Sequence, residues 1–198
     1  MANILAPFGF QFLGLLNGTP PNFAPQSMLI QANYNVAIGQ NDAVTMDTNG
    51  YITRVASGAN PLAGVFVGCR YLSVAFQRTV WRNYWPGTAD SVGDIEAYVI
   101  SHPDALFKVQ MSGAAPARAD ISGNYAYTNA TPSAANGLST MTLTSAAAAT
   151  TATLPWRLYD FYSHYGIPGE NGTDDTSAND IVVVLANNFI NKTNLGQA

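Results

Sequence analysis

Charged residues are scarce in this chain of 198 residues, which has 8 Lys and Arg and 12 Asp and Glu. They make up 10% of the sequence, against about 25% in ordinary globular proteins. The net charge is −4, and Lys108 and Lys192 are the only lysines. Such a chain attracts nucleic acid and anionic membranes weakly, so we expect neither as a partner. Either uncharged groups, such as those of the 18 Asn and 17 Thr, keep the surface soluble, or other protein covers part of it.

Cysteine, basic leader residues and long apolar runs are also rare. The single Cys69 cannot form an internal disulfide, and we expect it to be a small buried side chain. No Lys or Arg precedes Arg54, which argues against a secretory signal. The longest apolar run, at 181–186, is far shorter than the roughly 20 residues that span a bilayer. With 47% hydrophobic residues, the chain is nevertheless apolar enough to fold, and we expect it to do so in a reducing cytosol.

Groups that carry enzyme chemistry are few. His102 and His164 are the only imidazoles, and no nucleophile elbow, phosphate loop, dinucleotide fingerprint or zinc motif is present. Two acidic groups could supply oxygen ligands to a cation, although a solvated loop is the better explanation of each. They are Asp90, Asp94 and Glu96, and Asp174, Asp175 and Asp180. We therefore predict no catalytic residue, no metal and no cofactor, and we predict that the protein is not an enzyme.

Strand signals run through the chain from residue 28 onward. Asn49-Gly50 between the runs 43–47 and 51–55 is a strong hairpin signal. The continuous β-branched run at 181–186 is typical of a central strand. Further strands are expected at 28–34, 63–68, 95–100, 107–111 and 140–144. Short strands at this spacing indicate an all-β protein, an antiparallel sandwich or barrel of jelly-roll or β-tulip-like type.

Residues 1–27 differ in composition from the rest. Their four prolines exclude a regular helix or a central strand, while their four phenylalanines are too apolar for a solvated tail. We expect an extended N-terminal arm at 1–27, followed by a single β domain at 28–198. The aromatic side chains of the arm lie either on this chain's own core or on a neighbouring subunit.

Aromatic residues gather in two further segments, 71–85 and 156–165, with arginines among them. Trp, Tyr and Arg are enriched at the energetic centres of protein interfaces, so these segments and the arm are candidate contact regions. The candidate interface residues are Pro7, Phe8, Phe10, Phe12, Phe23, Trp81, Tyr84, Trp85, Trp156, Tyr159 and Tyr162. Exposed Trp also stacks on sugar rings, for which Trp81, Trp85 or Trp156 would serve.

Several short segments resemble those of a known group of proteins, and they occur in the same order. They are 1–3 (MAN), 6–10 (APFGF), 61–68 (PLAGVFVG), 104–110 (DALFKVQ), 152–155 (ATLP) and 181–184 (IVVV). Together they are similar to the capsid decoration, or cement, proteins of tailed bacteriophages.

The resemblance implies a structural virion protein that binds the outer capsid surface and stabilises the shell against internal genome pressure. Its partner would be the major capsid protein. Such proteins bind as oligomers at three-fold or two-fold positions, and we expect a homotrimer made in the host bacterial cytoplasm. A tail or head-fibre component is the alternative within the virion. A carbohydrate-binding β module is the alternative from another class.

Overall fold

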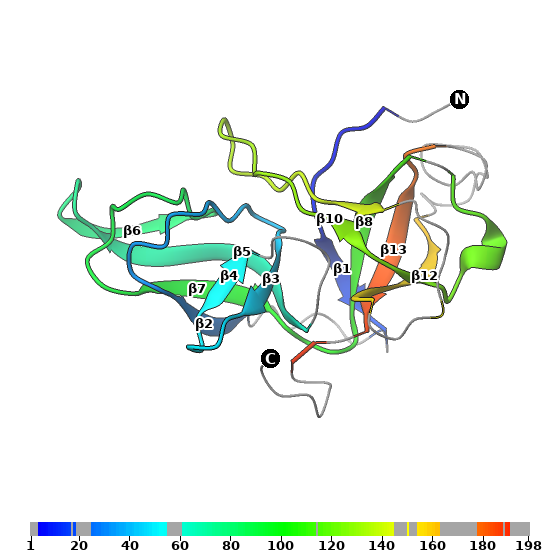
Figure 1. The fold of residues 1–198 in the computed structure, drawn as a ribbon, viewed down its shortest axis with the longest axis horizontal. Coiled ribbons are helices and arrows are strands. Elements are labelled where there is room, and N and C mark those ends of the chain that lie inside the picture. Colours follow the sequence, from blue (N-terminus) through cyan, green and yellow to red (C-terminus); the bar gives the residue numbers. More distant parts are fainter. Residues whose placement is uncertain are drawn as a thin grey trace.

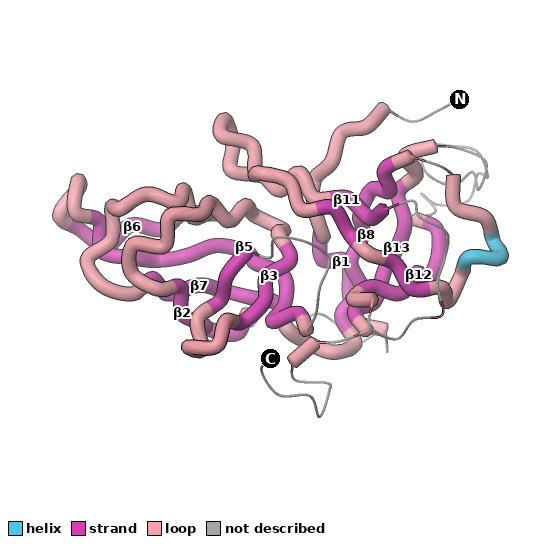
Figure 2. Tube along the Cα trace, in the orientation of Figure 1, coloured by secondary structure: helices cyan, strands magenta, loops and turns pink. Residues whose placement is uncertain are grey.

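The computed structural model of the protein describes residues 4–16, 18, 25–54, 61–113, 115–144, 150, 154–162, 178–187, 189 and 190. Within these ranges it has thirteen β-strands and one short 3-10 helix, Arg118–Asp120. Figure 1 shows the strands in two groups, and Figure 2 shows that strands and loops make up nearly all of the trace. The expected all-β class, with antiparallel sheets of the sandwich or barrel kind, is confirmed.

One group is a six-stranded sheet from the first half of the chain. Its strands are β2 (Gln26–Ile30), β3 (Ala43–Met46), β4 (Ile52–Arg54), β5 (Leu62–Ser73), β6 (Arg78–Arg82) and β7 (Ile95–Ile100). The order is β2–β7–β5–β3–β4, and β6 also pairs with β5. The long strand β5 has β7 along one edge, while β3 and β6 follow one another along the other edge.

The second group is a seven-stranded sheet. Its strands are β1 (Gln11–Leu15), β8 (Ala105–Ser112), β9 (Asn124–Tyr125), β10 (Tyr127–Thr128), β11 (Thr142–Thr144), β12 (Trp156–Phe161) and β13 (Ile181–Ala186). The order is β10–β11–β8–β13–β12–β9, with β1 on β8. All pairs are antiparallel except β11 with β8. β13 lies between β8 and β12, which confirms the central strand expected from its β-branched run.

Each sheet has its own hydrophobic core, and the two cores meet between the sheets. The core of the six-stranded sheet includes Phe66 and Trp85, both fully buried. The core of the seven-stranded sheet is built around Phe107 and Trp156. Ala43, Leu62 and Val65 belong to β3 and β5 but pack into this second core. One end of the six-stranded sheet is therefore buried against the other sheet.

Backbone hydrogen bonds join the two halves at the junction between the sheets. The N–H of Gln40 donates to the carbonyl of Gly137 at 2.8 Å, and the N–H of Ser139 donates to the carbonyl of Gln40 at 2.9 Å. The N–H of Phe10 donates to the carbonyl of Asn41 at 2.9 Å. The segment before β3 thus holds both the N-terminal region and the segment before β11.

The region predicted as an arm supplies strand β1, which is paired only with β8. The prolines lie at 7, 20, 21 and 25, which leaves the stretch between them free to pair as an edge strand. Phe10 is fully buried in the core of the seven-stranded sheet, and Phe12 packs against that core. Of the two hosts considered for these aromatic side chains, the structure places Phe10 and Phe12 on this chain's own core.

Gly9 enters the junction with a backbone that only glycine adopts easily. Its φ is +72°, and a Cβ there would lie 2.5 Å from the carbonyl oxygen of Asn41. Gly9→Ala is therefore expected to lower the free energy of unfolding by about 2 kcal/mol or more, as measured by urea denaturation. Gly50→Ala is the control, because its φ is +84° but nothing lies within 4 Å. Equal losses in the two variants would show that the close approach at Gly9 has no effect.

Candidate interaction surface

The six-stranded sheet is apolar on both faces, but only part of its second face is covered. One face lies on the sheet's own core, with Ile95, Ala97 and Val99 of β7 pointing inward. The opposite face is buried near the junction and exposed toward the β5–β6 hairpin. We call this exposed part the distal face. It comprises Leu29, Arg70, Leu72, Trp81, Val92, Glu96 and Tyr98.

The strand registers bring the distal face together from four elements. Arg70 of β5 lies between Glu96 of β7 and Trp81 of β6. Leu29 of β2 is opposite Glu96. Next along β5 comes Leu72, whose carbonyl accepts the N–H of Val92 at 2.9 Å. Alternate residues of a strand share one face, so these side chains form one surface.

Trp81 is the most prominent side chain of the distal face, with 63% of its surface exposed. Its ring stacks on Tyr98, with 4.6 Å between the ring centroids and 10° between the planes. The stack fixes the indole without hiding it. Because the Trp81 side chain is already ordered, it loses less conformational entropy when a partner binds to it.

Arg70 and Glu96 form an ion pair at the centre of the distal face. The Arg70 Nη2 is 2.6 Å from Glu96 Oε2, and the Ser27 hydroxyl donates to Oε1 at 3.1 Å. Partial desolvation acts to raise the pKa of Glu96, but the hydrogen bonds from Ser27 and Arg70 outweigh it and hold this pKa below its usual value. The carboxylate is therefore charged at neutral pH, and the face carries one charge of each sign.

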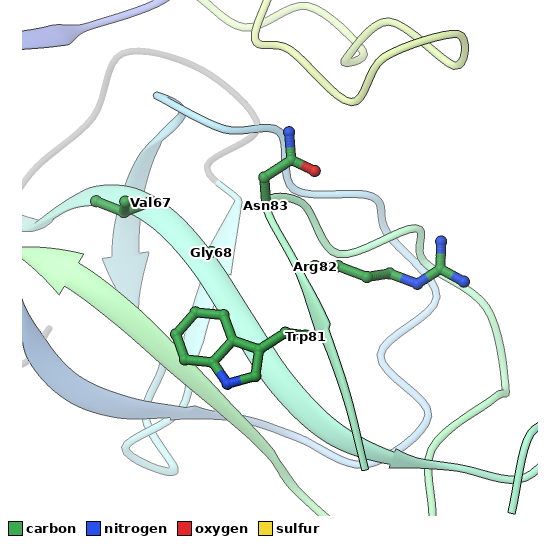
Figure 3. A pocket seen from close by; sticks show the side chains of 5 residues that line it. All are labelled: Val67, Gly68, Trp81, Arg82 and Asn83. Carbon is green, nitrogen blue, oxygen red and sulfur yellow. The ribbon is translucent and has the colours of Figure 1, made fainter. Parts of the chain in front are cut away.

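A shallow hollow of about 200 Å³ lies over β5 beside Trp81 (Figure 3). It is lined by Val67, Gly68, Trp81, Arg82 and Asn83. A Cβ on Gly68 would lie 2.9 Å from the carbonyl oxygen of Arg82, so glycine lets β6 approach β5 here. Trp81 is the aromatic member of this lining.

The structure separates the other interface candidates by their exposure. Phe10, Trp85 and Trp156 are fully buried in the two cores, so they are core residues of this chain and not part of its surface. Tyr159 is 46% exposed. The partly buried candidates are Pro7, Phe8, Phe12, Tyr84 and Tyr162. Phe23 lies outside the described residues.

The candidates do not form one cluster. Phe10 and Trp156 stack on each other inside the core of the seven-stranded sheet. Phe8 and Tyr162 flank the ammonium group of Lys108, at 5.9 Å and 4.9 Å from the ring centroids. Trp81 lies far from these residues in sequence position and on the other sheet. Among the predicted candidates that the structure describes, only Trp81 is part of the distal face.

The acidic residues singled out from the sequence have separate roles. Asp90 accepts hydrogen bonds from the Ser73 hydroxyl and the Ala75 N–H, and Asp94 accepts from Ala32 and Tyr51. Glu96 binds Arg70, as described above. The described part of the chain contains no group of three or more His, Cys, Asp or Glu that could hold a metal ion. Asp174 and Asp175 lie outside that part, and Asp180 is buried.

The remaining candidate chemical groups are isolated. His102 is exposed, and its Nδ1 accepts the N–H of Asp104. His164 lies outside the described residues. Cys69 is buried, as expected, and burial raises the pKa of its thiol to about 12. The thiol is therefore protonated at neutral pH and is poorly suited to nucleophilic chemistry.

Sequence reasoning missed the aliphatic members of the distal face. Leu29, Leu72 and Val92 are 46%, 43% and 56% exposed. The alternation of side chains along a strand is the signal that could have found them. In β6, Val80 and Trp81 are adjacent and must point to opposite faces of the sheet. With Val80 packed on the core, Trp81 has to face outward. Leu72 then follows by the same alternation from the buried Tyr71.

Comparison of the chain with protein-family models, with curated proteins and with solved structures finds no match in any of the three. Among the described residues, no helix is long and apolar enough to cross a membrane. A functional proposal therefore has to come from the residues themselves and from their geometry.

Proposed function

We propose that this protein is a structural virion protein that binds the outer surface of a tailed-phage capsid as a homo-oligomer and stabilises the shell. The major capsid protein is its partner, and the host bacterial cytoplasm is where it is made. The observation that carries this proposal is the distal face, an exposed aromatic and aliphatic surface on a β scaffold. The segments that resemble phage decoration proteins support the proposal from the sequence.

The composition of the distal face suits a protein partner. Trp, Tyr and Arg are the residue types that dominate the energetic centres of protein interfaces. Leu29, Leu72 and Val92 add exposed aliphatic side chains to the same surface. A contiguous apolar patch on a soluble protein marks an interaction site. Arg70 and Glu96 already form an ion pair, so neither charge is left without a partner when the distal face is buried in a contact.

The N-terminal residues offer a second apolar contact. Ile4 and Leu5 are 86% and 51% exposed, although the segment that carries them is held in place. The Gln110 side chain donates to the carbonyl of Ile4 and accepts the N–H of Ala6, both at 2.8 Å. Weak contacts of this kind, repeated in an oligomer, bind a symmetric shell strongly through effective concentration.

Loss of the Trp81 ring tests the proposal directly. In co-sedimentation with capsids that lack the protein, Trp81→Ser is expected to weaken binding at least tenfold, which corresponds to about 1.4 kcal/mol or more. Tyr159→Ser is the matched control, since Tyr159 is also exposed but lies on β12 of the other sheet. Failure of the wild-type protein to bind capsids at all would contradict the proposed function.

The exposed Trp81 and the hollow beside it are also compatible with the alternative function, carbohydrate binding. Of the three tryptophans considered for sugar stacking, Trp85 and Trp156 are buried, so this alternative depends on Trp81 alone. A glycan array with the wild-type protein and Trp81→Ser separates it from capsid binding. For the tail or head-fibre alternative, electron microscopy of labelled virions shows the position of the protein.

A further inference from the structure

We infer that the distal face is a two-fold contact, in which two copies of this chain pack their six-stranded sheets face to face. This inference rests on the homo-oligomer in the proposed function and names the surface that forms it. The starting observation is that one sheet face is covered at one end and uncovered at the other. In Figure 1, β5 runs from the junction with the seven-stranded sheet out to the hairpin at the far end of the molecule.

The covered and uncovered ends of this face have similar side chains. Near the junction, Val65 is 1% exposed and Ile100 packs against the core of the seven-stranded sheet. Toward the hairpin, Leu72 and Trp81 lie on the same face but are 43% and 63% exposed. The seven-stranded sheet covers the first end only. A second sheet packed on the distal face would give the other end the same kind of cover.

The charges of the distal face favour a second copy as the covering partner. A two-fold contact joins the same surface on both subunits, so that surface has to be complementary to itself. A face with charges of one sign would repel its copy, whereas this face carries Arg70 beside Glu96. In a two-fold arrangement, Arg70 of each copy lies against Glu96 of the other. The four charges then alternate in sign.

The exposed apolar surface also continues beyond the strands of the distal face. Val74 and Phe76 in the hairpin turn are 53% and 54% exposed and extend the apolar surface to the tip. Together with Leu29, Leu72, Trp81 and Val92 they make six large apolar side chains that are 43–63% exposed. An interface of standard size takes about 800 Å² from each partner. Trp81, held by Tyr98, would lie near the centre of this contact.

A contact of this kind closes after two copies, because each copy uses the same surface. It therefore favours a dimer, which suits a two-fold position on a shell. The trimer expected from the sequence would need a different, head-to-tail contact.

Charge reversal tests the two-fold contact in solution, with the mass of the complex measured by light scattering or native mass spectrometry. The wild-type protein is expected to be a dimer at about 100 μM, well above the micromolar Kd of a modest interface. Arg70→Glu and Glu96→Arg, each alone, place like charges opposite each other and should give monomers. An equimolar mixture of the two variants should form a heterodimer, and the double variant should form a dimer again.

Matched controls make each outcome decisive. Tyr159→Ser should remain dimeric, and circular dichroism should show that both charge variants are folded. A monomeric wild type, a trimer, or variants that stay monomeric when mixed would overturn the inference. A monomer that still co-sediments with capsids would overturn this contact and leave capsid binding in place, while a dimer that does not bind capsids would contradict capsid binding and not this contact.

Discussion

Replacing Phe10 by alanine is expected to lower the free energy of unfolding by about 3–5 kcal/mol, the usual cost of removing a buried aromatic ring. Phe10 is fully buried. Its ring stacks on Trp156 with 4.2 Å between the centroids and meets Tyr127 edge-on at 5.8 Å. Alanine would leave a cavity between these two rings. Urea denaturation followed by tryptophan fluorescence measures the loss.

Leu13→Ala is the matched control for Phe10→Ala. Leu13 lies on the same strand, β1, but is 43% exposed, so its truncation should cost about 1 kcal/mol or less. Equally small losses in the two variants would contradict the burial of Phe10 in the core. The same contacts show that a deletion of residues 1–27 removes a core ring together with the arm. Such a deletion therefore changes folding and is no specific test of attachment.

Asp42→Asn is expected to stabilise the protein at neutral and higher pH. Asp42 is fully buried at the junction between the sheets. Burial raises the pKa of its carboxyl to about 6 from an ordinary value of 3.8, although hydrogen bonds from Ser139 and Gly39 favour the charged form. The Gly39 N–H donates to Oδ2 at 2.7 Å. Asparagine keeps an acceptor for this N–H and removes the buried charge.

The direction of the pH dependence follows from the raised pKa. Between pH of about 4 and 6 the folded state binds more protons at Asp42 than the unfolded state, so the contribution of Asp42 to stability falls as the pH rises through this window. Above it, the charged carboxylate costs about 3 kcal/mol. Asp42→Asn should therefore be more stable than the wild type by about 1–3 kcal/mol at pH 8, and the difference should vanish near pH 4.

Urea denaturation of both proteins across this range measures the difference. Using the difference between variant and wild type cancels the titration of the remaining carboxylates, such as Asp90 and Glu96, whose pKa values are lowered. A wild type that is more stable than Asp42→Asn at pH 8 would show that the hydrogen bond from Ser139 and the nearby positive charge of Arg54, both of which favour the charged carboxylate, fully compensate its burial. That result would contradict the expected cost.

Local patterns in the sequence were sufficient for the strands whose face is set by alternation or by a continuous apolar run. The expected strands at 95–100 and 181–186 match β7 and β13 to the residue, and Asn49-Gly50 lies in the turn between β3 and β4, with Gly50 at a φ of +84°. β2 begins and ends earlier than expected, because its pairing with β7 fixes it at Gln26–Ile30.

Residue type alone could not separate core aromatics from surface aromatics. Large rings fill cores and interfaces for the same reason, which is the apolar area that they bury. Trp156 alternates with Leu158 along β12, and this pattern indicates an inward ring. The environment of Asp42 had no such signal. Its burial depends on the segment around Ser139, which is distant in sequence and meets Asp42 only in the folded chain.

The nesting of the two sheets in the sequence sets an order for folding during synthesis. All strands of the six-stranded sheet lie between Gln26 and Ile100, so this sheet has every partner as soon as β7 has left the ribosome. β1 is synthesised first but cannot pair until β8 has been made. β8 also pairs with β13, whose paired residues begin at Ile181. Pairings that span so much of the chain form slowly. The first strand to be synthesised is therefore among the last to be paired in the complete sheet.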